Sequence, residues 1–284
     1  MIPATPIDES SASRVPQSPG QKAHRVGSDL PFYAGLIVLG GAYLFLLLAM
    51  LIADLFYTSP GHLLAALGKP AIQYSIGLSL ISCSITALLS LWVAVPIGYL
   101  LARHRFRGHS LVDAILDIPI VLPPLVVGLS LLILFQFWPF RLAADWVVYQ
   151  IPAVILAQFM VACAFATRTL RTTFDQIDPR CEQVALTLGC SRAQAFASVV
   201  LPEARRGIIT AATLAWARSL GEFGPLLIFA GATRMKTEVL STTVFLELSV
   251  GDLEAAVAVS MIMIVAAVVV LMIARIWGSR DLTL

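Results

Sequence analysis

One apolar run limits what this chain can fold into more than any other feature. Residues 255–274 contain no charged residue and a single hydroxyl, Ser260. A run of about 20 such residues is the length of a membrane-spanning helix. The strands of a membrane β-barrel alternate polar and apolar residues, and this run does not. The composition agrees, because 13% of the chain's 284 residues are charged, against about 25% in soluble proteins. We therefore expect an all-helical integral membrane protein.

Six segments are apolar over about the length of a span. They cover residues 33–53, 75–102, 115–137, 151–167, 208–231 and 254–277. Residues 1–30 are rich in Pro, Ser, Gln and Gly and too polar for a signal peptide. We expect them to form a disordered cytoplasmic tail before a membrane domain over residues 31–284.

Lys and Arg fall unevenly on the two sides of these segments. If the N-terminus is inside, the inner loops hold most of the 19 basic residues, including the cluster Arg103, Arg105 and Arg107. The outer loops hold only Lys69, Arg141, Arg234 and Lys236. Because cytoplasmic loops are enriched in Lys and Arg, we expect both termini in the cytoplasm and interpret the cluster as an anchor.

The longest inner loop, about residues 168–207, has the signals of two short helices. Asp178-Pro179 is typical of a helix start, with an N-cap followed by Pro at the first helical position. Gly189 is typical of a helix end, since Gly adopts the left-handed conformation at no steric cost. Ser191 and Gln194 then predict a capping box for a second helix.

Both short helices have an apolar side. In the first, the stripe has helical spacing and consists of Cys181, Val184, Ala185 and Leu188. In the second it consists of Phe196, Val199 and Val200, and Pro202 marks the next helix start. These apolar sides need a surface to pack against. The pattern leaves open whether this is the chain's own spans or another protein.

The segment 208–231 carries two charges four residues apart, Arg218 and Glu222, which can pair on one helix face. A charge at membrane depth costs about 3 kcal/mol or more, so it usually has a partner or a function. The pair is either a structural link between spans or part of a pathway or gate. Gly221, Gly224 and Pro225 beside it allow a helix break and close helix approach.

Three prolines interrupt the segment 115–137. Pro119, Pro123 and Pro124 remove backbone donors shortly before Gly128. The kink that they predict either serves packing alone or exposes backbone groups to a polar substrate, as in discontinuous transporter helices.

The sequence lacks a Gly-x-x-x-x-Gly-Lys-Ser/Thr loop, and no catalytic or metal-ligand set is apparent in it. We therefore expect neither enzyme activity nor a cofactor, and we expect the four Cys to be reduced. Arg234 and Lys236 on the outer side either attract an anion or belong to a solvated loop.

The segment that begins at Glu182 resembles the EAA loop of the permease subunits of ABC importers. Ala185, Gly189 and the 13-residue step from Gly189 to Pro202 fit that loop, although Gln and Val replace the usual alanine pair after Glu182. Residues 118–128 and 217–224 are similar to the molybdate permeases, with sulfate and tungstate permeases close by. Pro225 replaces the family's usual Ala, and the outer segment 237–252 also departs from the molybdate permeases.

The resemblance implies the six-helix fold of type I importer permeases in the bacterial inner membrane. In that family the loop docks on an ATP-binding subunit, which binds the ATP. The implied assembly has two copies of this chain, two ATP-binding subunits and an extracytoplasmic oxyanion-binding protein. Molybdate is the favoured anion. Sulfate, thiosulfate or tungstate, an ion-coupled secondary transporter and a membrane scaffold are the alternatives.

The resemblance also suggests roles for individual residues. Coupling to the ATPase is expected of Glu182, Ala185, Leu188, Gly189, Phe196, Leu201 and Pro202. A translocation path or gate is expected at Pro119, Pro123, Pro124, Gly128, Arg218, Gly221, Glu222 and Gly224.

Overall fold

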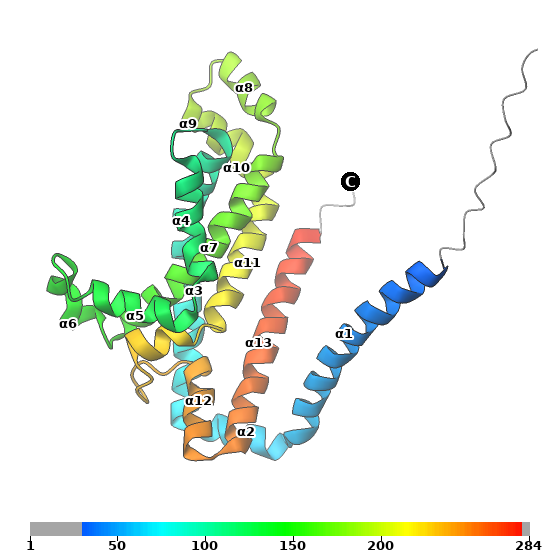
Figure 1. Ribbon diagram of the computed structural model, residues 1–284, viewed down its shortest axis with the longest axis vertical. Coiled ribbons are helices and arrows are strands. Elements are labelled where there is room, and N and C mark those ends of the chain that lie inside the picture. The colour runs from blue at the N-terminus through cyan, green and yellow to red at the C-terminus, as the bar shows by residue number, and fades with distance from the viewer. Residues whose placement is uncertain (1–29, 280–284) are drawn as a thin grey trace, which may run out of the picture. The chain divides into compact units, whose positions relative to one another are not determined.

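A computed structural model describes residues 30–279, and all regular structure in that range is helical (Figure 1). The elements are α1 (Leu30–Tyr57), α2 (Pro60–Gly68), α3 (Pro70–Arg103), α4 (His109–Val121), α5 (Pro124–Leu134), η1 (Phe140–Ala143), α6 (Ala144–Val147), α7 (Ile151–Gln176), α8 (Pro179–Thr187), α9 (Arg192–Ala195), η2 (Phe196–Val200), α10 (Leu201–Glu203), α11 (Arg205–Leu220), η3 (Leu226–Ala230), α12 (Leu240–Val250) and α13 (Leu253–Ser279). The chain divides into two units, residues 1–51 and 52–284, and each is described by itself. The tail expected at residues 1–30 lies outside the described residues except for Leu30, which begins α1.

Four of the described helices are long and apolar enough to cross a membrane. They are Phe32–Tyr57, Pro70–Arg103, Ile151–Gln176 and Leu253–Ile273. The pair α4 and α5 makes a fifth if the two helices count as one span. The expected segment 208–231 is interrupted, because α11 ends at Leu220 after 16 residues. The count of six spans therefore stays a prediction.

The prolines bend the third expected span. The axes of α4 and α5 differ by 112° across a short break, so residues 115–137 do not form one straight helix. Leu122 and Pro123 are extended, with ψ angles of 142° and 133°. A proline disfavours helical backbone in the residue before it, and Pro123 is followed at once by Pro124. The two prolines thus end one helix and begin another.

The fourth expected span is longer than the sequence indicated. Helix α7 continues past residue 167 to Gln176, because Leu170 and Phe174 extend its fully buried side. The hydroxyls of Thr169 and Thr173 donate to backbone carbonyls four residues earlier. The stretch between α7 and α11 is residues 177–204, and the expected bounds of the inner segment, about 168–207, stay a prediction.

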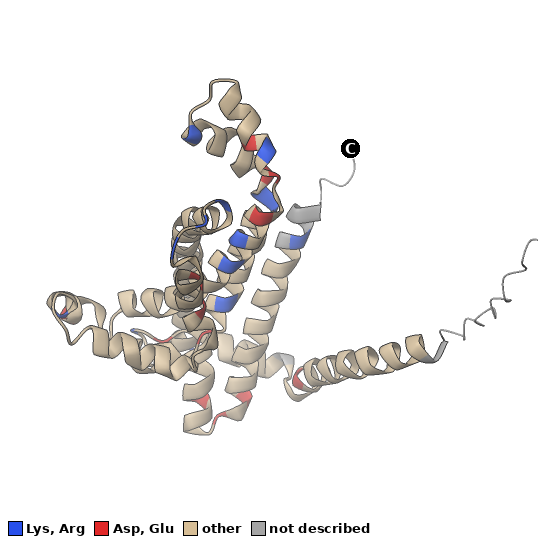
Figure 2. Ribbon diagram, turned by 45° about the horizontal axis from the view of Figure 1, so that its top comes forward, with Lys and Arg blue, Asp and Glu red and all other residues tan. Residues whose placement is uncertain are grey.

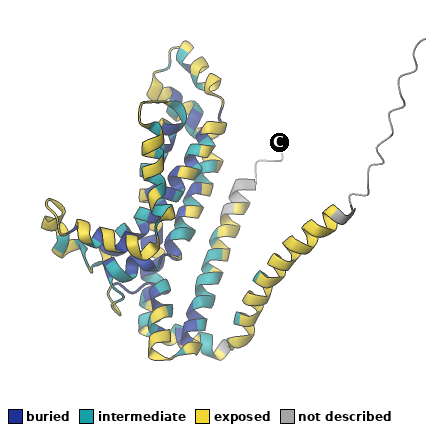
Figure 3. Ribbon diagram, in the orientation of Figure 1, coloured by how far each residue is buried: buried dark blue, intermediate teal, exposed yellow. Residues whose placement is uncertain are grey.

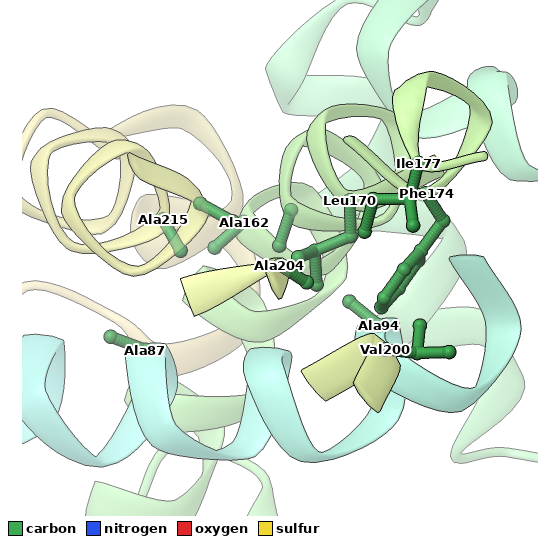
Figure 4. Packing of buried hydrophobic residues seen from close by; sticks show 11 residues of the cluster. Ala87, Ala94, Ala162, Leu170, Phe174, Ile177, Val200, Ala204 and Ala215 are labelled. Carbon is green, nitrogen blue, oxygen red and sulfur yellow. The ribbon is translucent and has the colours of Figure 1, made fainter. Parts of the chain in front are cut away.

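Small residues line the contacts among α3, α7 and α11. Ala94, Ala162 and Ala215, one from each helix, are fully buried in one cluster with Leu170 and Phe174 (Figure 4). Small side chains let helix backbones approach closely, which is how membrane helices gain packing energy. In the part of the chain that the structure describes, α3 and α7 hold the most buried residues (Figure 3). We call α3, α7 and α11 the helical framework. The inner segment is attached to its end.

Polar contacts reinforce this framework. The buried Gln158 of α7 accepts a hydrogen bond from Thr86 of α3 at 3.2 Å and donates one to the carbonyl of Ser219 in α11 at 3.3 Å. Ion pairs of Arg168 with Asp117, at 3.0 Å, and of Arg171 with Asp113 join α7 to α4. One glutamine therefore links all three central helices.

Lys and Arg collect mostly on the side of the second unit where α8 and α9 lie, whereas the turn between α12 and α13 carries acidic residues (Figure 2). The cytoplasmic position of both termini, which rests on the distribution of Lys and Arg in the sequence, stays a prediction.

Candidate functional site: an inner helix segment and a helix crossing

The capping signals of the inner segment are confirmed. Asp178 caps α8 by accepting from the backbone N–H of Arg180 at 2.9 Å. Gly189 follows α8 with a φ of +93°, the left-handed conformation that favours glycine. Ser191 and Gln194 form the capping box, with the side chain of each bonded to the backbone N–H of the other. Local sequence signals therefore fix where α8 begins and ends and where α9 begins.

The first helix keeps much of its apolar side away from the rest of the chain. Val184 is 56% exposed and Leu188 is 80% exposed, while Ala185 faces inward and is buried. Cys181 is exposed as well. Of the two surfaces that the sequence left open, the chain's own spans do not cover Val184 and Leu188. The chain therefore leaves these two apolar side chains exposed, and a docking surface there stays a prediction.

The second helix packs inward. The Phe196 ring lies 4.7 Å from the ring of Tyr99 in α3 and 6.5 Å from that of Phe174 in α7, measured between centroids. Val200 is fully buried in the cluster shown in Figure 4. Leu201 and Pro202 follow as the first residues of α10, and Pro202 is exposed. The predicted coupling residues thus include exposed side chains, such as Leu188 and Pro202, and side chains packed against the central helices, such as Phe196.

Glu182 is held by the end of α3. Its Oε1 accepts a hydrogen bond from the Tyr99 hydroxyl at 2.5 Å, and its Oε2 lies 3.6 Å from Nε of Arg103. Arg103, interpreted from sequence as a membrane anchor, is instead largely buried and also donates to the carbonyl of Ile177 at 3.0 Å. Sequence reasoning missed Tyr99 and this role of Arg103, since nothing local marks a contact over some eighty residues.

The predicted charge pair forms. Nη1 of Arg218 lies 2.7 Å from Oε2 of Glu222, whose side chain is 1% exposed. The guanidinium also lies over the Phe165 ring, 5.7 Å from its centroid. Neither carboxylate oxygen of Glu222 has a partner with hydrogen-bond geometry. The buried carboxylate is therefore compensated mainly by the charge of Arg218.

The structure brings the interrupted third and fifth segments together. A Cβ on Gly128 would lie 2.7 Å from Cα of Pro225, so α5 touches the break after α11 directly. Gly224 makes a similarly close approach to Pro124. A cavity of about 290 Å³ at this crossing is lined by Pro123, Pro124, Leu125, Arg218, Gly221, Glu222, Phe223 and Gly224.

Two of the predicted path residues, Pro119 and Gly221, take no part in these close contacts. Pro119 lies within α4 and does not line the cavity. Gly221 lines it, but a Cβ there would meet nothing closer than 3.8 Å. The crossing therefore gathers most of the candidate path residues, and it adds Pro225, Leu125 and Phe223 to them.

Beyond the spans, four charged side chains form one network. Lys69 Nζ donates to Asp252 Oδ2 at 2.8 Å and to Glu247 Oε2 at 3.1 Å, and Arg234 Nη1 donates to Glu247 Oε1 at 2.9 Å. The hydrogen bond from Lys69 lowers the pKa of the Asp252 carboxyl and, reciprocally, raises the pKa of the Lys69 ammonium. Arg234, a candidate from the sequence for attracting an anion, is paired with Glu247.

This geometry defines a class of protein: a multi-pass helical membrane protein with broken, charge-bearing helices and a pair of short helices of which one, α8, leaves apolar side chains exposed. Residues 94–280 match the family described as binding-protein-dependent transport system inner membrane component. The chain belongs to this family. It is thus a multi-pass inner-membrane component of an ABC transport system, as the sequence resemblance implied.

Two known proteins are similar to this chain in sequence, and one solved structure is similar to it in fold. The chain is 39% identical over 168 residues to the molybdate/tungstate transport system permease protein WtpB of Pyrococcus abyssi, a match that covers 59% of this chain and 64% of that protein. It is 30% identical over 244 residues to the sulfate transport system permease protein CysT of Escherichia coli, covering 84% and 87%. The fold resembles that of a chain in the crystal structure of a bacterial alginate ABC transporter in complex with an alginate-bound periplasmic protein. That likeness has a TM-score of 0.73 at 17% identity and covers 90% of this chain and 96% of the other.

Proposed function

We propose that this chain is the permease subunit of an ATP-driven importer that carries an oxyanion into the cytoplasm, with molybdate as the favoured anion. The observation that carries the proposal is the exposed side of α8 and of its C-cap, where Val184 and Leu188 lie at the inner end of the helical framework. An ATP-binding subunit that gripped this face would transmit its closure to the membrane helices. ATP would then be bound and hydrolysed on that subunit, and this chain would need no cofactor.

The assembly that fits this role has two copies of this chain and two ATP-binding subunits. An extracytoplasmic oxyanion-binding protein would deliver the anion on the other side. The crossing of α5 with the break after α11 would form the path or gate, because it combines a cavity, a charge and irregular backbone.

Molybdate is favoured over sulfate by the higher identity to the molybdate/tungstate permease. Sulfate is the second candidate, because the likeness to the sulfate permease spans more of this chain. Competition separates them: labelled molybdate uptake is measured in cells with and without this chain, in the presence of excess tungstate or sulfate. Molybdate transport predicts chain-dependent uptake that tungstate blocks and sulfate does not. Block by sulfate at equal concentration would move the assignment to sulfate.

The docking step has its own test. Leu188→Asp should leave the stability of the chain within about 0.5 kcal/mol, as is usual for exposed positions. The same change should reduce co-purification of the ATP-binding subunit at least tenfold, because it places a charge in an apolar contact. An ion-coupled carrier working alone would instead transport without that subunit and would be indifferent to the substitution.

A further inference from the structure

Tyr99 joins three parts of the molecule near the inner end of α3. Its hydroxyl donates to Glu182 of α8 at 2.5 Å. Its ring lies 4.7 Å from that of Phe196 in η2 and meets Phe174 of α7 edge-on at 5.8 Å. One side chain therefore contacts both short helices of the inner segment and one of the central helices.

Without such a contact, α8 would be only loosely attached to α7. The two residues between these helices, Ile177 and Asp178, are extended, with ψ angles of 125° and 120°. Gly189 provides a second break on the far side of α8. The covalent chain thus has a break at each end of α8, so other contacts must set its orientation.

The end of α3 supplies these contacts. Arg103 donates to the carbonyl of Ile177, within the first break, and its guanidinium faces the same Glu182 carboxylate that Tyr99 binds. A hydrogen bond to a charged acceptor is stronger than one between neutral groups. The first turn of α8 and Ile177, two residues before that helix, are therefore fixed to the last turns of α3.

Close packing joins this part of α3 to α7. A Cβ on Gly98, the residue before Tyr99, would lie 3.0 Å from the backbone nitrogen of Arg171 and 3.1 Å from Cβ of Leu170. At such separations the two backbones are in contact and cannot shift toward each other. A displacement of α3 at this level therefore moves α7 as well.

We propose that Tyr99 is the positioning residue through which movement of α8 reaches the membrane helices, so that α8 and the inner ends of α3 and α7 move as one body. This rests on the proposed function, in which the outer face of α8 docks on an ATP-binding subunit. The inner face of α8, which carries Glu182, then passes the movement on to α3. Tyr99 touches no substrate and acts only by holding Glu182 and Phe196 in place.

The decisive variant is Tyr99→Phe, which keeps the ring contacts and removes only the hydroxyl. In the purified complex with its ATP-binding subunits, this variant should assemble normally and hydrolyse ATP at close to the wild-type rate. Anion uptake per ATP hydrolysed should fall about five-fold or more. The matched control is Tyr74→Phe on the same helix, which removes a hydroxyl bonded to the carbonyl of Lys236 at 2.9 Å. It should leave the uptake ratio unchanged.

A distance measurement tests the rigid-body part directly. Spin labels are attached to the native, exposed Cys181 and to a His104→Cys substitution at the end of α3, with the other three cysteines replaced. The distance distribution should be narrow and the same without nucleotide and with trapped ATP. Tyr99→Phe should broaden it. A clear shift of the main distance on ATP binding in the otherwise native chain would overturn the proposal, as would an unchanged uptake ratio in Tyr99→Phe.

These outcomes are separable from failure of the proposed function. If the ATP-binding subunit does not associate with the wild-type chain, the proposed function fails. If it associates and drives uptake while Tyr99→Phe behaves as wild type, only the role of Tyr99 fails.

Discussion

Gly224 and Pro124 are in direct contact where the third and fifth segments cross. A Cβ at Gly224 would lie 2.7 Å from the Cβ of Pro124 and 2.9 Å from the backbone nitrogen of Leu125. No side chain larger than hydrogen fits between these two backbones. The crossing therefore depends on glycine at this position for steric reasons.

Gly224→Ala should destabilise the protein by about 1–3 kcal/mol, the usual cost of an added methyl group in a packed site. The lowered thermal unfolding midpoint in detergent is the measurement, together with reduced uptake. Gly221→Ala is the matched control, since its Cβ would have 3.8 Å of clearance and its φ of −83° suits alanine. Equal effects of the two substitutions would contradict the steric account.

Arg218→Ala should leave Glu222 as an unpaired buried carboxylate. Breaking a buried ion pair costs about 3–5 kcal/mol, and we expect the lower end because Arg218 is partly exposed. The double variant Arg218→Ala/Glu222→Gln removes the buried charge and should recover most of the unfolding midpoint. If uptake recovers with stability, the pair is structural. If stability returns while uptake does not, the pair serves the path or gate.

Gly189→Pro should abolish uptake while membrane insertion remains normal. Proline fixes φ near −65°, whereas Gly189 has a φ of +93° and its N–H donates to the carbonyl of Leu186 at 3.1 Å. The substitution should therefore misplace α8 relative to α9. Uptake with radiolabelled anion and membrane fractionation give the two readouts. Unchanged uptake would exclude a coupling role for this segment.

The network around Lys69 predicts how stability depends on pH. The pKa of Asp252 is lowered from 3.8, so its contribution is present above that value and is lost as pH falls through the lower folded pKa. The pKa of Lys69 is raised from 10.5, so its contribution is present below that value and is lost as pH rises through the higher folded pKa. The hydrogen bond therefore stabilises the fold at all pH values between these limits.

Lys69→Met should accordingly lower the unfolding midpoint at pH 5 to 9, a range inside those limits. The difference from wild type should shrink as pH falls below about 4, where Asp252 begins to be protonated in the unfolded chain. Thermal unfolding at a series of pH values gives this difference. A constant difference down to pH 3 would show that Lys69 acts through packing rather than through its charge.

The local features of the inner segment could be predicted from sequence because each depends on neighbouring residues. Asp178, Gly189 and Ser191 act through backbone groups within a few positions, so their patterns are sufficient. The Arg218–Glu222 pair could be predicted for the same reason, because its members are only four residues apart in the sequence, although α11 ends at Leu220 between them.

What the sequence could not predict depends on contacts between distant residues. Tyr99 and Glu182 meet only because the last turns of α3 lie beside the first turn of α8, and no spacing rule predicts that contact. The extension of α7 to Gln176 also escaped detection, because polar residues such as Thr169 and Thr173 reduce apparent hydrophobicity while the buried side continues. The prolines indicated a kink at the third segment, but the 112° angle depends on where α5 finds its packing partner.

The pairing of Lys69 and Arg234 with Glu247 and Asp252 has a consequence for how an anion would arrive. Two positive and two negative side chains cancel, so this network offers little long-range electrostatic attraction to a diffusing anion. Electrostatic steering makes an association rate fall steeply as salt concentration rises. An uptake rate that barely responds to ionic strength would mean that capture of the anion is achieved by close-range recognition, before it reaches these helices.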